Sequence, residues 1–184
     1  MRFSFNPEKA VEAIVWVASK QDGGVDLYRI LKTIFDAEVT HLNSFGLPIV
    51  GDDFIAMQYG PVPGNTYDII KLEDPIWNEE IENKMGSVPF SKIEKGGKTY
   101  FIVPNRQPNL DVFSENNLHA LSDAWEKCKG LSFNELHGLY AKHPSYITAR
   151  ENRHSEREIM NIAEWIDNPR TTEQLAEIGS KLVL

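Results

Sequence analysis

The feature that most constrains this sequence is a corner rich in glycine and proline, residues 46–64, which follows a run of helical periodicity. Before the corner, apolar residues recur at three- and four-residue spacing from Leu27 to Val39. This spacing predicts an amphipathic helix of about four turns. Pro48 and the glycines on either side of it cannot continue that helix. The chain must therefore change direction here through a stiff connection.

After the corner, the pattern predicts two short helices. Asp52 and Asp53 are candidate N-caps for a helix from Phe54 to Tyr59. The glycines and prolines of residues 60–64 end that helix abruptly, and a second helix is expected from about residue 65 to 72.

Capping signals mark the remaining helices. In the clearest of them, Ser132 and Glu135 form a capping box, in which each side chain binds a free backbone amide of the other residue. The expected helices cover residues 7–20, 114–128, 132–143, 156–166 and 172–184, with one further turn at 145–150. Residues 73–87 are rich in Glu and Asp and are expected to form an exposed acidic connection.

The periodicity changes to that of strands at residue 88. Two β-prone runs, 88–93 and 98–103, flank a turn that contains Gly96 and Gly97, which is typical of a hairpin. An isolated hairpin is marginally stable in water, so this one must lie on the helical body or on a partner. The predicted fold class is therefore mainly α, a compact helical bundle with one small antiparallel β-hairpin at about residues 88–103.

The corner also carries a motif. Residues 46–63 read G-x-P-I-x-G-D-x-F-x-A-M-x-x-G-P-V-P, after a helix that contains His41 and Leu42 and before Tyr67 and Asp68. This arrangement resembles the Panacea domain of the SocA-like antitoxin family.

The resemblance extends beyond the motif. A later segment, residues 113–136, is similar to the closing helices of the family, so that the likeness spans roughly residues 7–150. It implies a single Panacea-like domain over residues 1–184, in which 151–184 form a C-terminal helical extension.

The resemblance implies an antitoxin of a toxin–antitoxin system, encoded in bacteria or their prophages. Such a protein neutralises a cognate protein toxin by direct binding, without catalysis and without a cofactor. Some relatives act instead as adaptors that deliver the toxin to a protease. The expected partner is therefore a protein toxin, with a protease as a possible second partner.

Composition supports a protein-binding role. With 41% apolar and 25% charged residues, the chain has the composition of a globular protein, and no apolar run approaches the length of a membrane span. A cytoplasmic location is expected by elimination, because no secretory signal is recognisable. The net charge of −8 suits a basic protein better than nucleic acid, although Arg150 to Arg157 concentrate three arginines. Nothing in the sequence specifies an oligomeric state.

An enzyme remains an alternative. His41 with Asp52 or Asp53 could form the metal site of a hydrolase, since imidazole and carboxylate groups bind zinc, iron or manganese. In the simpler interpretation, no metal is bound, His41 interacts with the end of its helix and an aspartate caps the next one. Cys128, the only cysteine, is expected to be a buried thiol.

The corner is the first candidate for the toxin-binding surface, because aromatic and proline residues are dense there. Phe54 and Met57 are expected in the core, whereas Tyr59 and the turn from Pro61 to Pro63 are expected at the surface. The predicted partner-binding residues are Asp52, Asp53, Tyr59, Pro61, Val62, Pro63 and Tyr67. The hairpin is the second candidate, since it offers a strand edge and places Tyr100 and Phe101 on opposite faces.

Overall fold

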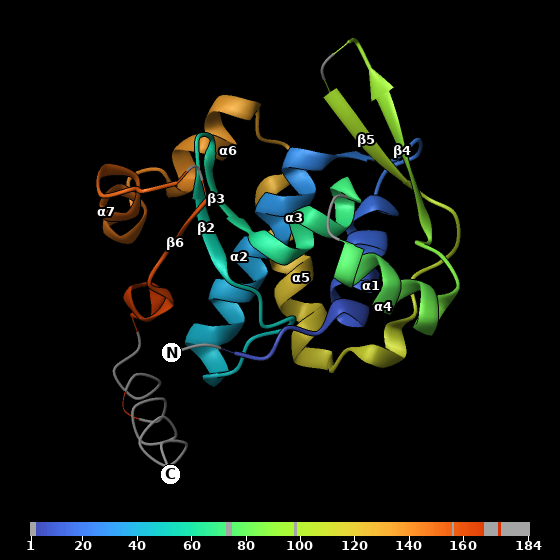
Figure 1. The fold of residues 1–184 in the computed structure, drawn as a ribbon, viewed down its shortest axis with the longest axis horizontal. Coiled ribbons are helices and arrows are strands. Elements are labelled where there is room, and N and C mark those ends of the chain that lie inside the picture. The colour runs from blue at the N-terminus through green and yellow to red at the C-terminus, as the bar shows by residue number, and fades with distance from the viewer. Residues whose placement is uncertain (1–2, 73–74, 98, 156, 168–172, 174–184) are drawn as a thin grey trace.

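The computed structural model describes residues 3–72, 75–97, 99–155, 157–167 and 173. These residues form seven α-helices, two short 3-10 helices and six strands, and the strands make two three-stranded antiparallel sheets (Figure 1). The mainly α class is confirmed. The expectation of a single hairpin is wrong, because a second sheet forms at the corner.

The helices are α1 (Pro7–Ala18), α2 (Leu27–Phe45), α3 (Gly64–Lys71), α4 (Pro75–Met85), η1 (Leu110–Val112), α5 (Glu115–Cys128), α6 (Phe133–Tyr140), α7 (Pro144–Glu151) and η2 (Ile162–Trp165). The strands are β1 (Val25–Asp26), β2 (Phe54–Met57), β3 (Gly60–Pro63), β4 (Phe90–Lys95), β5 (Thr99–Pro104) and β6 (Glu158–Ile159). None of the helices within the described ranges combines the length and the apolar character that crossing a membrane requires.

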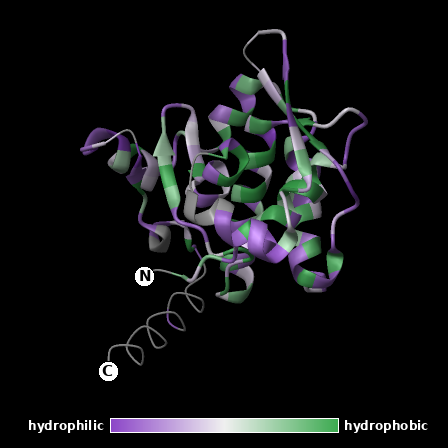
Figure 2. Ribbon diagram, turned by 45° about the vertical axis from the view of Figure 1, so that its right-hand side comes forward, coloured by the Kyte–Doolittle hydropathy of each residue, from purple (hydrophilic) through white to green (hydrophobic). Residues whose placement is uncertain are grey.

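Helix α2 is the axis of the fold, with α5 and α1 packed along it (Figure 1). It contributes to two apolar clusters. Ile30 and Ile34 join the larger cluster with α1 and α5, whereas Phe35 joins a second cluster with β2, α6 and α7. Figure 2 shows hydrophobic residues gathered on the central helices. Because α2 packs into both apolar clusters, its position relative to the elements of each cluster is fixed.

The first sheet has the strand order β1-β5-β4. Its hairpin confirms the prediction for residues 88–103, with Ile93 opposite Phe101. The short strand β1 pairs Val25 with Ile102 and Asp26 with Phe101, after which the chain enters α2. Ile102 is buried, whereas the outer end of the hairpin projects beyond the helices (Figure 1).

The second sheet replaces the predicted helix from Phe54 to Tyr59. Strands β2 and β3 pair antiparallel around a two-residue turn, Gln58 and Tyr59, and β6 pairs with the other edge of β2. Gly60 closes the turn with a φ of +98°, a backbone conformation that favours glycine. The run Phe54–Met57 is apolar without alternation, and a short run of this kind fits a buried strand as well as a helix.

Three other expectations change. Residues 73–87 are not only a connection, because α4 forms within them and buries Ile81. The predicted helix at 156–166 is wrong: β6 pairs with β2 in this segment, and a 3-10 helix follows. The single turn at 145–150 is part of the longer helix α7. The predicted helix at 172–184 lies outside the described residues.

Candidate functional site

The start of α2 positions the candidate site. The Asp26 carboxylate caps this helix by accepting from the backbone N–H of Arg29 at 2.9 Å and from its Nε at 3.0 Å. The Arg29 guanidinium also donates to the carbonyl oxygens of Cys128 and Leu131, the latter at 2.9 Å. These bonds fasten the start of α2 to the connection between α5 and α6, so Leu27 and Tyr28 occupy a fixed place between the two sheets.

The turn between β2 and β3 is fastened to the helices by two tyrosines. The hydroxyl of Tyr28 donates to the carbonyl oxygen of Tyr59 at 2.5 Å. The hydroxyl of Tyr146 donates to Met57 O at 2.8 Å and accepts from Gly60 N at 3.2 Å. Burial, with smaller contributions from Tyr146 and Asp26, raises the pKa of Tyr28, so its hydroxyl keeps the proton that it donates.

Aromatic side chains from three elements meet beside this turn. The ring of Phe133, the first residue of α6, lies 4.5 Å from the ring of Tyr28 and 5.4 Å from that of Tyr59, measured between centroids. Tyr59 is 51% exposed and Phe133 is 48% exposed. Exposed aromatic residues in contact with one another form an apolar patch, and apolar patches are the kind of surface at which proteins bind partners.

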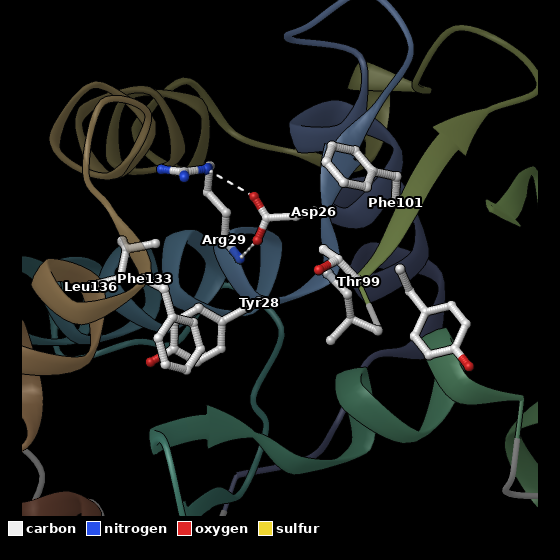
Figure 3. Close-up of a pocket in the computed structure, with 9 residues that line it drawn as sticks. Asp26, Tyr28, Arg29, Thr99, Phe101, Phe133 and Leu136 are labelled. Carbon is white, nitrogen blue, oxygen red and sulfur yellow. Dashed lines mark hydrogen bonds and ion pairs between the residues drawn. The ribbon is translucent and has the colours of Figure 1, made fainter. Parts of the chain in front are cut away.

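Two neighbouring cavities open at this cluster. The first, about 390 Å³, lies between α2, α6 and the hairpin (Figure 3) and is lined by Asp26, Leu27, Tyr28, Arg29, Thr99, Tyr100, Phe101, Phe133 and Leu136. The second, about 300 Å³, lies beside the turn and is lined by Leu27, Tyr28, Leu31, Met57, Gln58, Tyr59, Gly60, Val62 and Tyr67. They share Leu27 and Tyr28, and together we call them the aromatic groove.

The charges in the aromatic groove are already paired. Among the described residues, Asp26 and Arg29 are its only acidic or basic lining residues, and they bind each other in the first cavity, as the dashed lines in Figure 3 mark. A ligand entering the groove would meet mostly aromatic and aliphatic walls, and the two charges among the described lining residues compensate each other. Such a lining fits apolar side chains of a partner better than a charged small molecule.

A buried lysine lies under the groove. Lys32 is fully buried, and its Nζ donates to Pro61 O at 2.5 Å and lies 5.0 Å from the centroid of the Tyr28 ring. Burial lowers the pKa of Lys32 to about 7. A Cβ at Gly60 would lie 2.7 Å from Nζ, so glycine at this position leaves room for the lysine.

The predicted site residues divide between the groove and the interior. Tyr59, Tyr67 and Val62 line the second cavity. Pro61 and Pro63 are buried in β3, so the expectation that Pro61 to Pro63 form a surface turn is wrong. As the outer strand of its sheet among the described residues, β3 can accommodate prolines, which cannot donate to a neighbouring strand.

The two aspartates also lie away from the groove lining. Asp52 is buried and caps α3, accepting from the backbone N–H groups of Asn65 at 2.9 Å and Thr66 at 2.8 Å and from both of their side chains. An aspartate therefore caps a helix as expected, but the helix is α3. Asp53 is half-buried, and its carbonyl oxygen accepts from Gly64 N at 2.9 Å.

The residues considered for a metal site have other partners. Nδ1 of His41 lies 2.6 Å from Leu47 O and its Nε2 lies 2.9 Å from Nδ2 of Asn117, so both ring nitrogens are engaged. Both oxygens of Asp52 are engaged at α3. Within the described residues, no group of three His, Cys, Asp or Glu side chains is placed to hold a metal ion.

The arginine-rich segment is likewise tied to the protein. Arg150 donates to Ala56 O at 3.2 Å, and Arg157 binds both carboxylate oxygens of Asp68 at 2.7 Å. Cys128 is buried as expected, and burial raises the pKa of its thiol to about 11.

Sequence reasoning missed Tyr28 and Phe133, which form the centre of the groove. Both are aromatic residues in the first turn of a helix, where the buried stripe begins: Phe133 precedes Leu136 by three residues, and Tyr28 precedes Leu31 by three residues. An aromatic residue in the first turn of a predicted helix was the available signal. The contact between these two rings could not be predicted from the sequence, because the two residues are 105 positions apart.

Comparison with known proteins identifies the family. The family model described as "Antitoxin SocA-like, Panacea domain" matches residues 30–145, well over half of the chain. That range includes the glycine- and proline-rich corner, both strands of the hairpin and most of the aromatic groove. No curated protein and no solved structure gives a significant match. The chain belongs to the SocA-like antitoxin family with a Panacea domain.

Proposed function

We propose that this protein is an antitoxin that neutralises a cognate protein toxin in the cytoplasm by direct, stoichiometric binding, and that the aromatic groove receives the toxin. The observation that carries the proposal is the convergence of the exposed rings of Tyr59 and Phe133 on Tyr28. The family supports the role of antitoxin.

The chemistry of the groove supports protein binding. Energetic hot spots of protein interfaces are enriched in aromatic residues that become fully desolvated, and the centres of interfaces are poor in charged residues. Tyr59 and Phe133 have the exposed area to bury, and the paired charges of Asp26 and Arg29 add no unpaired charge to the contact. The Tyr28 hydroxyl holds the β2–β3 turn in place, which lowers the entropy lost on binding.

The test is growth rescue by co-expression. The product of the adjacent reading frame is expressed alone and with this chain, and both proteins are tagged for co-purification. Phe133→Ala and Tyr59→Ala should each weaken binding by about tenfold or more. Phe45→Ala is the matched control, because Phe45 is also 48% exposed. It lies at the opposite end of α2 from the groove residue Leu27, about 27 Å away along the helix axis.

The outcomes separate the alternatives. Toxicity that this chain relieves, with co-purification that the groove variants reduce, supports direct neutralisation. Rescue in which the toxin disappears, and reappears when cellular proteases are inactivated, would identify a proteolytic adaptor. Rescue at far less than one copy per toxin would indicate an enzyme, for which His41→Ala is then the first variant. Equal effects of Phe133→Ala and Phe45→Ala would exclude the groove as the binding surface.

A further inference from the structure

The outer edge of β4 is exposed in the described part of the chain. Strand β4 lies at the end of the order β1-β5-β4, and among the described residues no strand pairs with its other side. Every residue after Phe90 in this strand is exposed. The outer part of the hairpin stands clear of the helices (Figure 1). An exposed strand edge is a template for pairing with another strand.

The register shows which backbone groups point outward. Asn105 N donates to Pro89 O at 2.9 Å, so residues 89, 91, 93 and 95 of this hairpin direct their backbone groups toward β5. The other side of β5 agrees, because the carbonyl oxygen of Ile102, the partner of Lys92, points at Gly24 beside β1. By alternation, Lys92 and Glu94 direct their N–H and C=O groups away from the molecule.

The side chains of this edge are complementary to themselves. If two copies of β4 pair antiparallel about Ile93, Lys92 of each copy lies opposite Glu94 of the other. These residues point outward in both copies, so each such pair can exchange two backbone hydrogen bonds. Ile93, 44% exposed, then faces Ile93 of the second copy, next to its own partner Phe101. Opposite charges and apolar pairs across strands both stabilise a sheet.

We infer that the protein forms a symmetric homodimer in which the β4 edges of two copies pair antiparallel about Ile93 and join the two hairpins into one continuous sheet. The same surface patch serves both copies, as a two-fold interface requires.

The charge pattern also selects the register. A shift of two residues in one direction sets Lys92 against Lys92, and a shift in the other sets Glu94 against Glu94, and like charges directly opposite destabilise a sheet. Within the described residues, neither side chain has an ion-pair partner; Nζ of Lys92 lies 5.1 Å from the centroid of the Tyr100 ring.

The experiment is a charge-swap series on the full chain, followed by light scattering after size exclusion and by sedimentation. Glu94→Lys places lysines opposite each other in both pairs, and Lys92→Glu does the same with glutamates. Each single variant should weaken self-association by roughly tenfold or more. The double variant Lys92→Glu/Glu94→Lys should restore the dimer, and an equimolar mixture of the two single variants should form a heterodimer.

Other outcomes would overturn the inference. A wild-type protein that is monomeric at its highest soluble concentration rules out the dimer. A dimer that survives both single variants uses a different surface. All substitutions lie at exposed positions, so melting temperatures near that of the wild type are expected and would show that loss of the dimer is not loss of folding. The result does not depend on a toxin, so it stands or falls separately from the proposed function.

Discussion

Lys32 is a basic residue held in the interior of the protein. Its ammonium group is fully buried, and Pro61 O is the hydrogen-bond acceptor that holds it. Burial lowers its pKa from 10.5 to about 7, which means that a buried charge is unfavourable there. Its Nζ lies 5.0 Å from the centroid of the Tyr28 ring. Protonation of Lys32 therefore changes the charge next to a residue that lines the groove.

This environment predicts a pH dependence of stability. The unfolded chain holds the Lys32 proton up to about pH 10.5, and the folded chain releases it at about pH 7. Between these values the unfolded state binds more protons, so the free energy of unfolding should rise with pH, by about 5 kcal/mol over the window. Urea unfolding at several pH values should show this rise in the wild type.

Lys32→Met is the reference for that measurement. The variant lacks the titrating group, so the difference between the two proteins isolates Lys32 from every other group. At pH 7 and below, the variant should be the more stable protein, and its advantage should shrink as the pH rises. Parallel curves for the two proteins would show that Lys32 titrates normally in the folded state.

Local signals at the residue scale were predictable, whereas distant contacts were not. Ser132 caps the helix that follows it, as the sequence predicts, and Asn6 and Ser114 cap the helices whose positions were predicted at residues 7–20 and 114–128. Glu38 is different, because it accepts from the backbone N–H groups of Ile49 and Val50 across the corner. Burial raises the pKa of Glu38 to about 7. The spacing of a glutamate within a helix does not indicate that its carboxylate will bind backbone N–H groups of a distant loop.

At the scale of elements, Asp52 links the corner to α3. Pro63, at the N-cap position of this helix, supplies no side-chain hydrogen bond, and the Asp52 carboxylate takes that role from outside the helix. Asp52→Ala should therefore cost about 2–4 kcal/mol, since it removes the acceptor that the backbone N–H groups of Asn65 and Thr66 use. Asp53→Ala, at the half-buried neighbour, should cost less than about 1 kcal/mol. Thermal unfolding of both variants gives the comparison, and equal losses would contradict the assignment of the cap.

A substitution at Gly24 tests how closely the backbones of β1 and β5 approach each other. Its φ is +85°, and a Cβ there would lie 2.2 Å from the carbonyl oxygen of Ile102. Gly97 is the control, with a φ of +80° and open space around it. Gly97→Ala should cost about 1 kcal/mol from backbone strain alone, and Gly24→Ala should cost at least about 2 kcal/mol more because the strands must separate. Chemical denaturation measures both, and similar costs would mean that the strands can yield.

The elements that the sequence failed to predict share a physical cause. The segment Phe54–Met57 is too short for periodicity to separate a strand from a helix, and its pairing with β6 joins residues about 100 positions apart. The hairpin of residues 90–104, by contrast, is a local structure with a Gly-Gly turn, and it forms as predicted. The aromatic groove lies between elements of both kinds, so its assembly depends on tertiary packing.

At the scale of the whole molecule, charge and groove have separate roles. The net charge of −8 produces a long-range field, whereas the two charges lining the groove are paired with each other. Long-range charge accelerates the encounter with a basic partner, and well-packed apolar contacts set the lifetime of the complex. The family match over residues 30–145 includes most of the groove but says nothing of this division.

The division predicts how salt affects toxin binding. Raising the ionic strength from about 0.05 to 0.5 M shortens the screening length, so the association rate with a basic toxin should fall by about tenfold or more. The dissociation rate should change by less than about twofold, because the desolvated contacts at Tyr59 and Phe133 carry no charge. Phe133→Ala should show the opposite pattern, with faster dissociation and an unchanged salt dependence of association. Surface plasmon resonance with the purified toxin separates the two rates, and a dissociation rate that rises steeply with salt would place ion pairs, rather than aromatic rings, at the centre of the interface.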